Sequence, residues 1–530
     1  MSMQVEEKLE QLSVVPQAHP SYYMLHKYWG RKPHNLLDEY IELFTNKGDV
    51  VLDPFMGSGG VPIESNKLER KAIGIDLNPM ACFITETTLL TDIDYDDLRQ
   101  KFEDIIDSIP EDVIDLTYTT GEDGNDWLID NAVWEEGKLV RIKYYKDTVR
   151  MIKDADETDI ARTELAKEVL KKYEDLGYIS YPKDKIMDYV KRSGKEYINE
   201  LFTERNLLIA AFVIAGINKI NDKKIRDMLL LVFSSALPNF SNMIPGDKRT
   251  VNGKSGWQIS KFWVPKVHAE KNAINTLRMR LEKIIKGKQD VEKLLTETEY
   301  KISNTSSEKI SFLDDETVDY VFTDPPYGDS ISYFALSSFW STWLNHTVDY
   351  KNEIIIDPYR NKREKDYSVR LDKVFKEVYR VLKKNSYMSF TFNNRHVKYW
   401  KIVIDAVYSA GFDLINVKWV DQPVASGTQG LNRKNTLKGD FVYTFKKLDK
   451  PCDFSDDHKN GEQIILDTMT DFTKKQKYVT TADLYEKLIP RIIKERAYYD
   501  SDDKLLDIDK FIAKTFNYEE QPDGKFGWTL

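Results

Sequence analysis

The chain has 530 residues, of which 41% are hydrophobic and 31% charged. Its length exceeds one ordinary hydrophobic core, so several domains are expected, and its composition excludes a disordered protein. Only two cysteines occur, Cys82 and Cys452, which excludes a disulfide scaffold and a cysteine-rich zinc ribbon and is typical of a reducing compartment. Residues 1–20 lack an apolar signal core, and the longest apolar stretches are too short to cross a bilayer. We therefore expect a cytoplasmic protein without a membrane partner.

The net charge of −10 argues at first against a nucleic-acid partner. The charge is segregated, however, because lysines and arginines gather between residues 248 and 288, while acids concentrate in 92–130 and after residue 449. A local basic surface can bind phosphate on an acidic protein, although a charge run is also typical of solvated helix faces. Charge alone leaves both interpretations open.

The first predicted unit is a strand, a glycine turn, a helix and a second strand. Its elements are a helix over 35–44, a strand over 49–53, a helix over 61–68 and a strand over 71–76. Both strands end in an acid, Asp53 and Asp76. This succession predicts one βαβ unit of a doubly wound sheet.

The sheet is interrupted after this unit and resumes about 240 residues further on, which is too long a gap for a loop. The intervening stretch, 94–298, has a β-rich opening over 127–145 and strongly periodic helical segments over 201–220 and 225–237. Afterwards we predict strands over 318–323, 386–392, 412–420 and 440–445, with helices over 367–382 and 399–410. The tail, 448–530, contains an amphipathic helix over 482–494 with a capping signal at Thr480 and Asp483. The expected fold is therefore α/β, with a doubly wound sheet split by a large, mostly helical insertion and followed by a small helical module.

The glycine turn belongs to the string Asp53-Pro54-Phe55-Met56-Gly57-Ser58-Gly59. Its glycines allow a ligand to approach the backbone, and the following helix offers free N–H groups. Asp53 is a candidate acceptor for a cofactor's amino group. Asp76 follows the turn by about twenty residues, the place where an acid binds ribose hydroxyls in dinucleotide folds. A glycine turn in an unrelated α/β protein would not account for this acid.

The second string, Asp324-Pro325-Pro326-Tyr327, directly follows the strand over 318–323. The Asp324 carboxylate and the Pro325 carbonyl can accept both protons of a planar exocyclic amine, whose lone pair is otherwise delocalised into the ring. The prolines stiffen the backbone, and Tyr327 can stack on the planar ring that carries the amine. If that ring is a nucleic-acid base, extruding it from its stack costs a few kcal/mol, and stacking on one aromatic side chain returns ~1–3 kcal/mol. The alternative is an ordinary Asp-Pro-Pro surface turn.

Both strings in this order resemble the S-adenosyl-L-methionine-dependent amino-methyltransferases, the N6-adenine and N4-cytosine DNA methyltransferases, in an alpha-like motif order. The resemblance implies a Rossmann-like methyltransferase sheet, S-adenosyl-L-methionine as the cofactor and DNA as the partner. It implies that 1–93 and 299–447 form the catalytic domain and that 94–298 carries target recognition. We also expect 448–530 to be an accessory module, which acts as a lid or docks a restriction or defence-system subunit. One departure is that the insertion begins after the second strand, earlier than this pattern places it.

The resemblance also implies a set of site residues. The expected catalytic residues are Asp324, Pro325, Pro326 and Tyr327. The expected cofactor-binding residues are Trp29, Gly30, Lys32, Asp53, Phe55, Gly57, Gly59, Asp76 and Asp324. The first three lie in His26–Pro33, which resembles the segment placed against the cofactor's methionine end, although its aromatics could equally pack on the sheet. The expected nucleic-acid-binding residues are Lys248, Arg249, Lys254 and Trp257, where basic and aromatic side chains are interleaved.

The favoured function is methyl transfer to the N6 amine of a flipped adenine in double-stranded DNA. Cytosine-N4 methylation uses the same geometry but more often a serine in place of the aspartate. Guanine-N2 methylation of transfer RNA is a further alternative, although those enzymes usually carry an RNA-capturing domain before the catalytic core. A non-catalytic assembly subunit is the last alternative, against which the intact Asp53, Asp76, Asp324 and Tyr327 argue.

Overall fold

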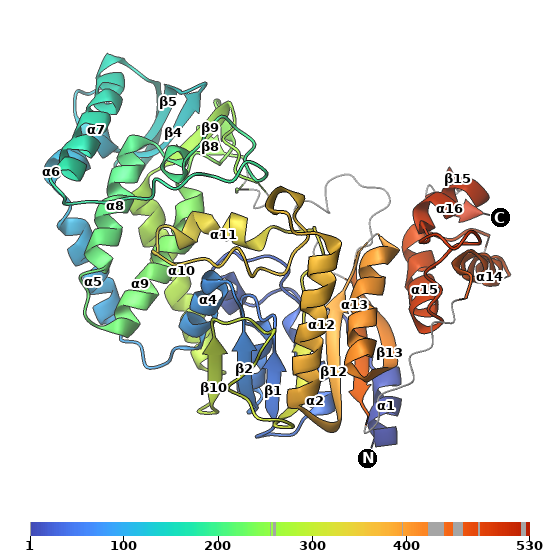
Figure 1. The fold of residues 1–530 in the computed structure, drawn as a ribbon. Coiled ribbons are helices and arrows are strands. Elements are labelled where there is room, and N and C mark those ends of the chain that lie inside the picture. The colour runs from blue at the N-terminus through green and yellow to red at the C-terminus, as the bar shows by residue number, and fades with distance from the viewer. Residues whose placement is uncertain are drawn as a thin grey trace.

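A computed structural model describes residues 2–254, 256–257, 261–394, 396–421, 439–448, 459–474, 477–520 and 526–529. Its centre is a seven-stranded sheet of order β10-β2-β1-β11-β12-β14-β13 (Figure 1). The strands are β1 Val50–Asp53, β2 Lys71–Ile75, β10 Tyr300–Ser303, β11 Val318–Thr323, β12 Leu382–Phe392, β13 Phe412–Asp421 and β14 Gly439–Lys447. The five strands from β10 to β12 are parallel, and β14 runs antiparallel to both of its neighbours. Segments from both sides of the insertion thus build one sheet.

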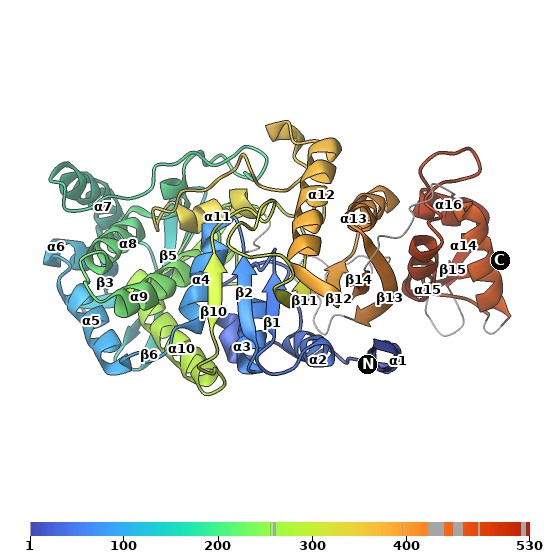
Figure 2. The same cartoon turned by 60° about the horizontal axis from the view of Figure 1, so that its bottom comes forward.

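Helices cover both faces of this sheet because alternate side chains of each buried strand point to opposite faces. The covering helices include α1 Ser2–Gln11, α2 His34–Phe44 and α3 Gly60–Lys67 on one face, and α12 Glu364–Val381 and α13 Val397–Ala410 on the other (Figure 2). Val51 and Tyr320 pack toward the first group, whereas Leu52 and Val321 pack toward the second. The expected Rossmann-like doubly wound sheet is confirmed.

β10 is the strand that the sequence pattern does not mark clearly. It pairs in parallel with β2 and closes one edge of the sheet. Its four residues are exposed or half-buried, so no apolar run or strict alternation announces it. The more buried strands and helices of the catalytic sheet lie within a few residues of their predicted ranges.

The insertion combines helices with a second, antiparallel sheet. After α4 (Pro79–Leu89) come α5 Tyr95–Asp107, α6 Glu111–Ile114, α7 Glu157–Asp175, α8 Glu204–Ile217, α9 Lys223–Ala236 and α10 Ala273–Glu292. The second sheet contains β3 Tyr118–Thr120, β4 Asp126–Glu135, β5 Lys138–Lys146, β6 Val149–Asp154 and β9 Val267–Lys271, and a separate hairpin joins β7 Gly246–Asp247 to β8 Asn252–Gly253. The β-rich opening and the helical bulk are both confirmed. Helix α8 begins later than predicted because the Thr203 hydroxyl caps it by accepting from the Asn206 N–H.

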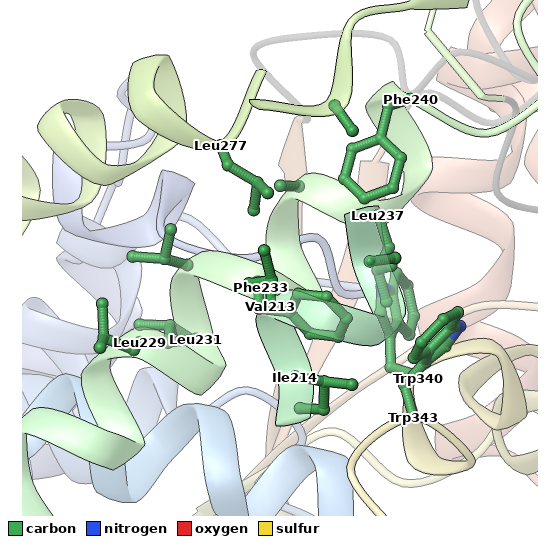
Figure 3. Close-up of a cluster of buried hydrophobic side chains, with 14 of the residues drawn as sticks. Val213, Ile214, Leu229, Leu231, Phe233, Leu237, Phe240, Leu277, Trp340 and Trp343 are labelled. Carbon is green, nitrogen blue, oxygen red and sulfur yellow. The ribbon is translucent and has the colours of Figure 1, made fainter. Parts of the chain in front are cut away.

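The insertion and the catalytic part share one hydrophobic core. Helix α11 (Tyr333–Ser341), which follows the Asp-Pro-Pro-Tyr string, packs against the helices of the insertion. Figure 3 shows Trp340 and Trp343 beside side chains of α8 and α9. The rings of Phe233 and Trp343 lie 5.5 Å apart, and those of Phe202 and Phe339 stack at 5.7 Å. The segment that follows β11 is therefore packed against the insertion through aromatic side chains.

The C-terminal module lies at the β13 edge of the sheet (Figure 1). It contains α14 Gly461–Thr473, α15 Thr481–Lys494, α16 Ile508–Thr515 and a hairpin of β15 Asn517–Glu520 with β16 Phe526–Thr529. Helix α15 contacts α13 and β13, and Thr480 caps it by accepting from the Asp483 N–H at 3.2 Å, as predicted. Among the described residues, no helix is both long and apolar enough to cross a membrane.

Candidate active site

A cavity lies at the carboxyl ends of the parallel strands β1, β2 and β11, and each of these ends carries a carboxylate side chain. Its volume is about 1200 Å³, counting the open space at its mouth. The expected site residues that line it are Trp29, Gly30, Lys32, Asp53, Phe55, Gly57, Asp76, Asp324 and Pro326. The two strings, which lie far apart in the sequence, therefore face the same cavity.

Asp76 fixes the glycine turn to the end of β2. Its Oδ2 accepts the Gly57 N–H at 2.9 Å, and its Oδ1 accepts the Asn78 N–H at 2.8 Å. Burial raises the pKa of Asp76 to about 7. Each oxygen keeps a second acceptor position, so this carboxylate can also bind hydroxyl groups of a ligand.

Gly59 has a different role from Gly57. Gly59 is the N-cap residue of α3 and has a φ of +80°. It is not among the described residues that line the cavity. A Cβ at this position would lie 2.4 Å from the Cγ2 of Thr85 on α4. Gly59 therefore permits the close packing of α3 on α4, and the structure does not bring it to the ligand side with Gly57.

Asp53 joins β1 to the catalytic strand. Its Oδ1 accepts from the Thr323 hydroxyl at 2.6 Å and from the Phe55 N–H at 3.0 Å. Burial raises the pKa of Asp53 to about 8, with Asp324 and Asp76 contributing repulsion. This carboxylate braces the start of the glycine turn and couples it to the residue before Asp324.

Asp324 is held from three sides. Its Oδ1 accepts the Tyr327 hydroxyl at 2.7 Å and the Thr391 hydroxyl at 2.6 Å, and its Oδ2 lies 3.1 Å from the Lys32 ammonium. Burial raises the pKa of Asp324, and Lys32 opposes that rise. The carboxylate is thus fixed at the cavity wall by Tyr327 of its own string and by partners from two distant segments.

The rest of the Asp-Pro-Pro-Tyr string is also fixed. The Pro326 carbonyl accepts from the Tyr367 hydroxyl on α12, whereas the Pro325 carbonyl takes no hydrogen bond from the residues that the structure describes. The Tyr327 ring packs against Phe392 at 4.9 Å. Because its hydroxyl donates to Asp324, Tyr327 orients the carboxylate in addition to the stacking role that the sequence suggests.

The Lys32 ammonium lies between two carboxylates. It is 3.1 Å from Asp324 and 3.0 Å from Asp440, and it also donates to the Tyr327 hydroxyl at 3.0 Å. Burial alone would lower the pKa of Lys32, but the two carboxylates raise it above its usual range. The sequence suggests a direct cofactor contact for this lysine, while the structure places its charge on the acceptor Asp324.

Arg31 is the cation of this wall that sequence reasoning missed. Its Nε donates to the Ser58 hydroxyl at 2.7 Å, and its guanidinium makes no ion pair with any carboxylate in the described ranges. Burial lowers the pKa of Arg31 to about 10, so it stays charged at neutral pH. An uncompensated cation in a cavity favours an anionic ligand group.

Comparison with known proteins decides the family. A family model described as DNA methylase, of the N6 and N4 type, matches residues 5–87 and 318–515, on both sides of the insertion. The chain belongs to this DNA methylase family.

Curated relatives agree with this family. The chain is 21% identical over 337 residues to the type II methyltransferase M.MjaII of Methanocaldococcus jannaschii, which covers 58% of this chain and 59% of the relative. It is 30% identical over 120 residues to the type II methyltransferase M.HpaI of Haemophilus parainfluenzae, which covers 22% of this chain and 38% of the relative. The matches thus span less than two thirds of these relatives. A SAM-dependent methyltransferase structure from Methanosarcina mazei matches 77% of this chain and 97% of its own at 10% identity and a TM-score of 0.25.

The cavity of this methylase fits the expected cofactor, S-adenosyl-L-methionine. The cofactor carries a carboxylate, which suits the uncompensated Arg31, and an ammonium and a sulfonium, which suit a cavity lined by Asp53 and Asp76. Gly57 adopts a φ of +51° in the turn beside the cavity. The charges and shape of the residues present are compatible with this group.

The residues expected to bind nucleic acid are only partly brought together. Lys248 and Arg249 form the exposed turn of the β7–β8 hairpin, and Lys254 is exposed directly after it. Trp257 is instead only 4% exposed, and its ring stacks on Phe262 at 5.7 Å. The structure thus corrects the expectation for Trp257, whose indole belongs to the aromatic core and cannot reach a duplex from this position.

Proposed function

We propose that this methylase transfers a methyl group from S-adenosyl-L-methionine to the exocyclic N6 amine of an adenine in double-stranded DNA. The observation that carries the proposal is the position of Asp324, a hydrogen-bonded acceptor at the wall of the cavity that Asp53, Gly57 and Asp76 also line. The aspartate at this position supports adenine over cytosine, for which serine is more frequent. Extrusion of the base from the duplex would bring its amine to this wall.

The mechanism requires the enzyme to direct the amine lone pair and to exclude water. When bound, S-adenosyl-L-methionine supplies a methyl group already activated by its positive sulfur. The Asp324 carboxylate and the unoccupied Pro325 carbonyl accept the two amine protons, which turns the nitrogen lone pair away from the ring. One proton leaves the nitrogen as it is methylated, and Asp324 is the group placed to take it toward solvent. Tyr327 and Thr391 keep this carboxylate aimed throughout.

The deciding experiment is transfer of labelled methyl to bacterial DNA and to total transfer RNA, followed by mass analysis of the nucleosides. N6-methyladenine in DNA is the expected product. Detection of N4-methylcytosine would identify cytosine as the substrate base, and label in RNA guanine would favour the transfer-RNA alternative. Cofactor binding without any transfer would overturn catalysis by this chain alone and favour the assembly subunit.

The β7–β8 hairpin supports a DNA surface on the insertion. Its backbone is held by Arg141, which donates to the Lys248 carbonyl at 2.9 Å, and by Arg150, which donates to the Thr250 carbonyl at 2.7 Å. Lys248 pairs with Glu135, whereas Arg249 lies exposed at the tip. Basic side chains on a braced turn suit contact with phosphates.

We expect the double variant Lys248→Glu and Arg249→Glu to weaken DNA binding and to make its salt dependence shallower. Each lost phosphate contact reduces the slope of log K against log salt by about 0.9. Fluorescence anisotropy with a labelled duplex at several salt concentrations measures this slope. Lys171→Glu, on the exposed surface of α7, is the control, because it reverses a charge of the insertion away from the hairpin. Equal slopes for the hairpin variant and the wild type would place the DNA surface elsewhere.

The roles of the remaining parts stay predictions. Target recognition by 94–298 is supported by the hairpin, and the domain boundaries at 93, 298 and 447 follow from the sequence alone. The C-terminal module packs on α13 and β13 at the edge of the sheet. Its docking of a restriction or defence-system subunit is a prediction that deletion of 448–530 and partner capture would test.

A further inference from the structure

The acceptor Asp324 is connected to a second carboxylate, Asp440, through one ammonium group. Asp440 lies at the start of β14, two strands away from β11, and its Oδ2 is 3.0 Å from the Lys32 ammonium. The side chains of Lys32, Asp324 and Asp440 are 9%, 22% and 11% exposed. Charges this far removed from water interact strongly, so the state of one affects the other two.

The fold brings Asp440 to this place by strand order. β12 and β14 pair antiparallel, with Phe392 opposite Phe441, so the beginning of β14 lies beside the end of β12. The Asn393 side chain donates to the Gly439 carbonyl at 2.7 Å and ties these ends together. Thr391, which donates to Asp324, is on the same end of β12. Asp440 is therefore part of the rigid frame behind the acceptor.

The ammonium has three donors and three acceptors around it. Lys32 reaches Asp324, Asp440 and the Tyr327 hydroxyl, and that hydroxyl donates onward to Asp324. Within the described part of the chain, both carboxylates thus contact the same ammonium. If Asp440 were neutral, the ammonium would interact with Asp324 alone, and the incoming amine would have to compete with a stronger ion pair for the same oxygen.

We propose that Asp440 is a positioning residue for methyl transfer, because it shares the Lys32 ammonium with Asp324 and thereby keeps the Asp324 carboxylate available to the amine. This inference rests on the proposed function, in which Asp324 accepts an amine proton. It adds a carboxylate and a defined role for Lys32 that neither the two strings nor the family match indicates. The Lys32 ammonium attracts the Asp324 carboxylate, and Asp440 limits the strength of this attraction.

The pH dependence of the rate has opposite signs for the two partners of this network. Among the residues that the structure describes, the titratable groups around Asp324 are Lys32, Asp53, Tyr327, Tyr333 and Asp440. Burial raises the pKa of Asp324, Lys32 lowers it and Asp440 raises it. Since the ionised form is active, Asp440→Asn should move the acidic limb of the rate profile to lower pH, whereas Lys32→Met should move it to higher pH.

The test is single-turnover methyl transfer to DNA between pH 5 and 9 with saturating cofactor. We expect Asp440→Asn to lower the plateau rate by about 10- to 100-fold, the effect of a misplaced reacting group, with little change in cofactor affinity by calorimetry. Asp440→Glu keeps the charge and should keep the wild-type acidic limb. Asp319→Asn is the matched control, an aspartate on β11 that pairs with Lys383 at 2.6 Å but lies at the other end of the strand.

The outcomes separate this inference from the proposed function. If the wild type methylates no nucleic acid, the proposed function fails. If the wild type methylates DNA and Asp440→Asn has the same rate and pH profile, only the inference is overturned. A lower rate with an unshifted acidic limb, or an equal loss of cofactor affinity, would also overturn it, because a purely structural role predicts those results. Thermal unfolding identifies any variant that does not fold, and Asp440→Asn with Asp440→Glu decides the question without Lys32→Met.

Discussion

Asp324→Ala is expected to lower the rate of methyl transfer by about 10²–10⁴-fold, the range typical of a group that handles a proton in the transition state. The alanine removes the acceptor for the amine, while Lys32 keeps its ion pair with Asp440, so no buried charge is left alone. Cofactor binding should change little, because Arg31, Asp53 and Asp76 remain. Single-turnover transfer to DNA and calorimetric titration of the cofactor measure the two effects separately.

Two further variants make this prediction specific. Asp324→Asn keeps a neutral acceptor of the same shape and should lose less activity than the alanine variant. Asp329→Ala removes an exposed carboxylate from the same loop and serves as the control. Turnover of Asp324→Ala at the wild-type rate would show that the amine is activated elsewhere.

Arg31→Met is expected to weaken binding of S-adenosyl-L-methionine and of its product S-adenosylhomocysteine. A hydrogen bond to a charged group contributes about 1.5–3 kcal/mol, which corresponds to about 10- to 150-fold in affinity. Methionine keeps most of the apolar length of the side chain but removes the charge. Calorimetric titration with both ligands measures the loss without any dependence on turnover.

The matched ligand for this prediction is 5′-methylthioadenosine, which has the same nucleoside but no carboxylate. Its affinity should be the same for the wild type and Arg31→Met if Arg31 acts on the carboxylate. Arg31→Lys should restore part of the affinity for the product. An equal loss for both ligands would mean that Arg31 shapes the pocket through Ser58 and does not bind the carboxylate.

Local sequence patterns predicted the parts of the site that lie next to strand ends. Asp53 and Asp76 follow buried apolar runs, and the expected β1, β2 and β11 are present within a residue or two. Asp53, Asp76 and Asp324 are all expected to bind the cofactor, and because parallel strands end at one edge of a sheet, they should lie close together. The structure confirms this convergence in one cavity.

Residues that depend on long-range packing could not be predicted in the same way. Asp440 begins an antiparallel strand, and nothing near it in the sequence shows that Lys32 lies beside it. Trp257 stands among basic residues, as a base-contacting aromatic would, yet its surroundings in space are Phe262, Phe339 and Trp340. The residues next to a position in the sequence indicate its local charge well but its burial poorly, because burial depends on elements that are distant in the sequence.

The aromatic core shared by α11 and the insertion restricts how this protein can acquire a new target sequence. Exchange of residues 94–298 as one unit would remove the side chains of the insertion that bury Trp340 and Trp343. A buried tryptophan covers about 150–250 Å² and contributes about 4–6 kcal/mol each at ~25 cal/mol per Å², so the loss would approach the net stability of a typical domain. New specificity is therefore accessible by substitution on the outer hairpins and sheet, with α8, α9 and α11 inherited together as a unit.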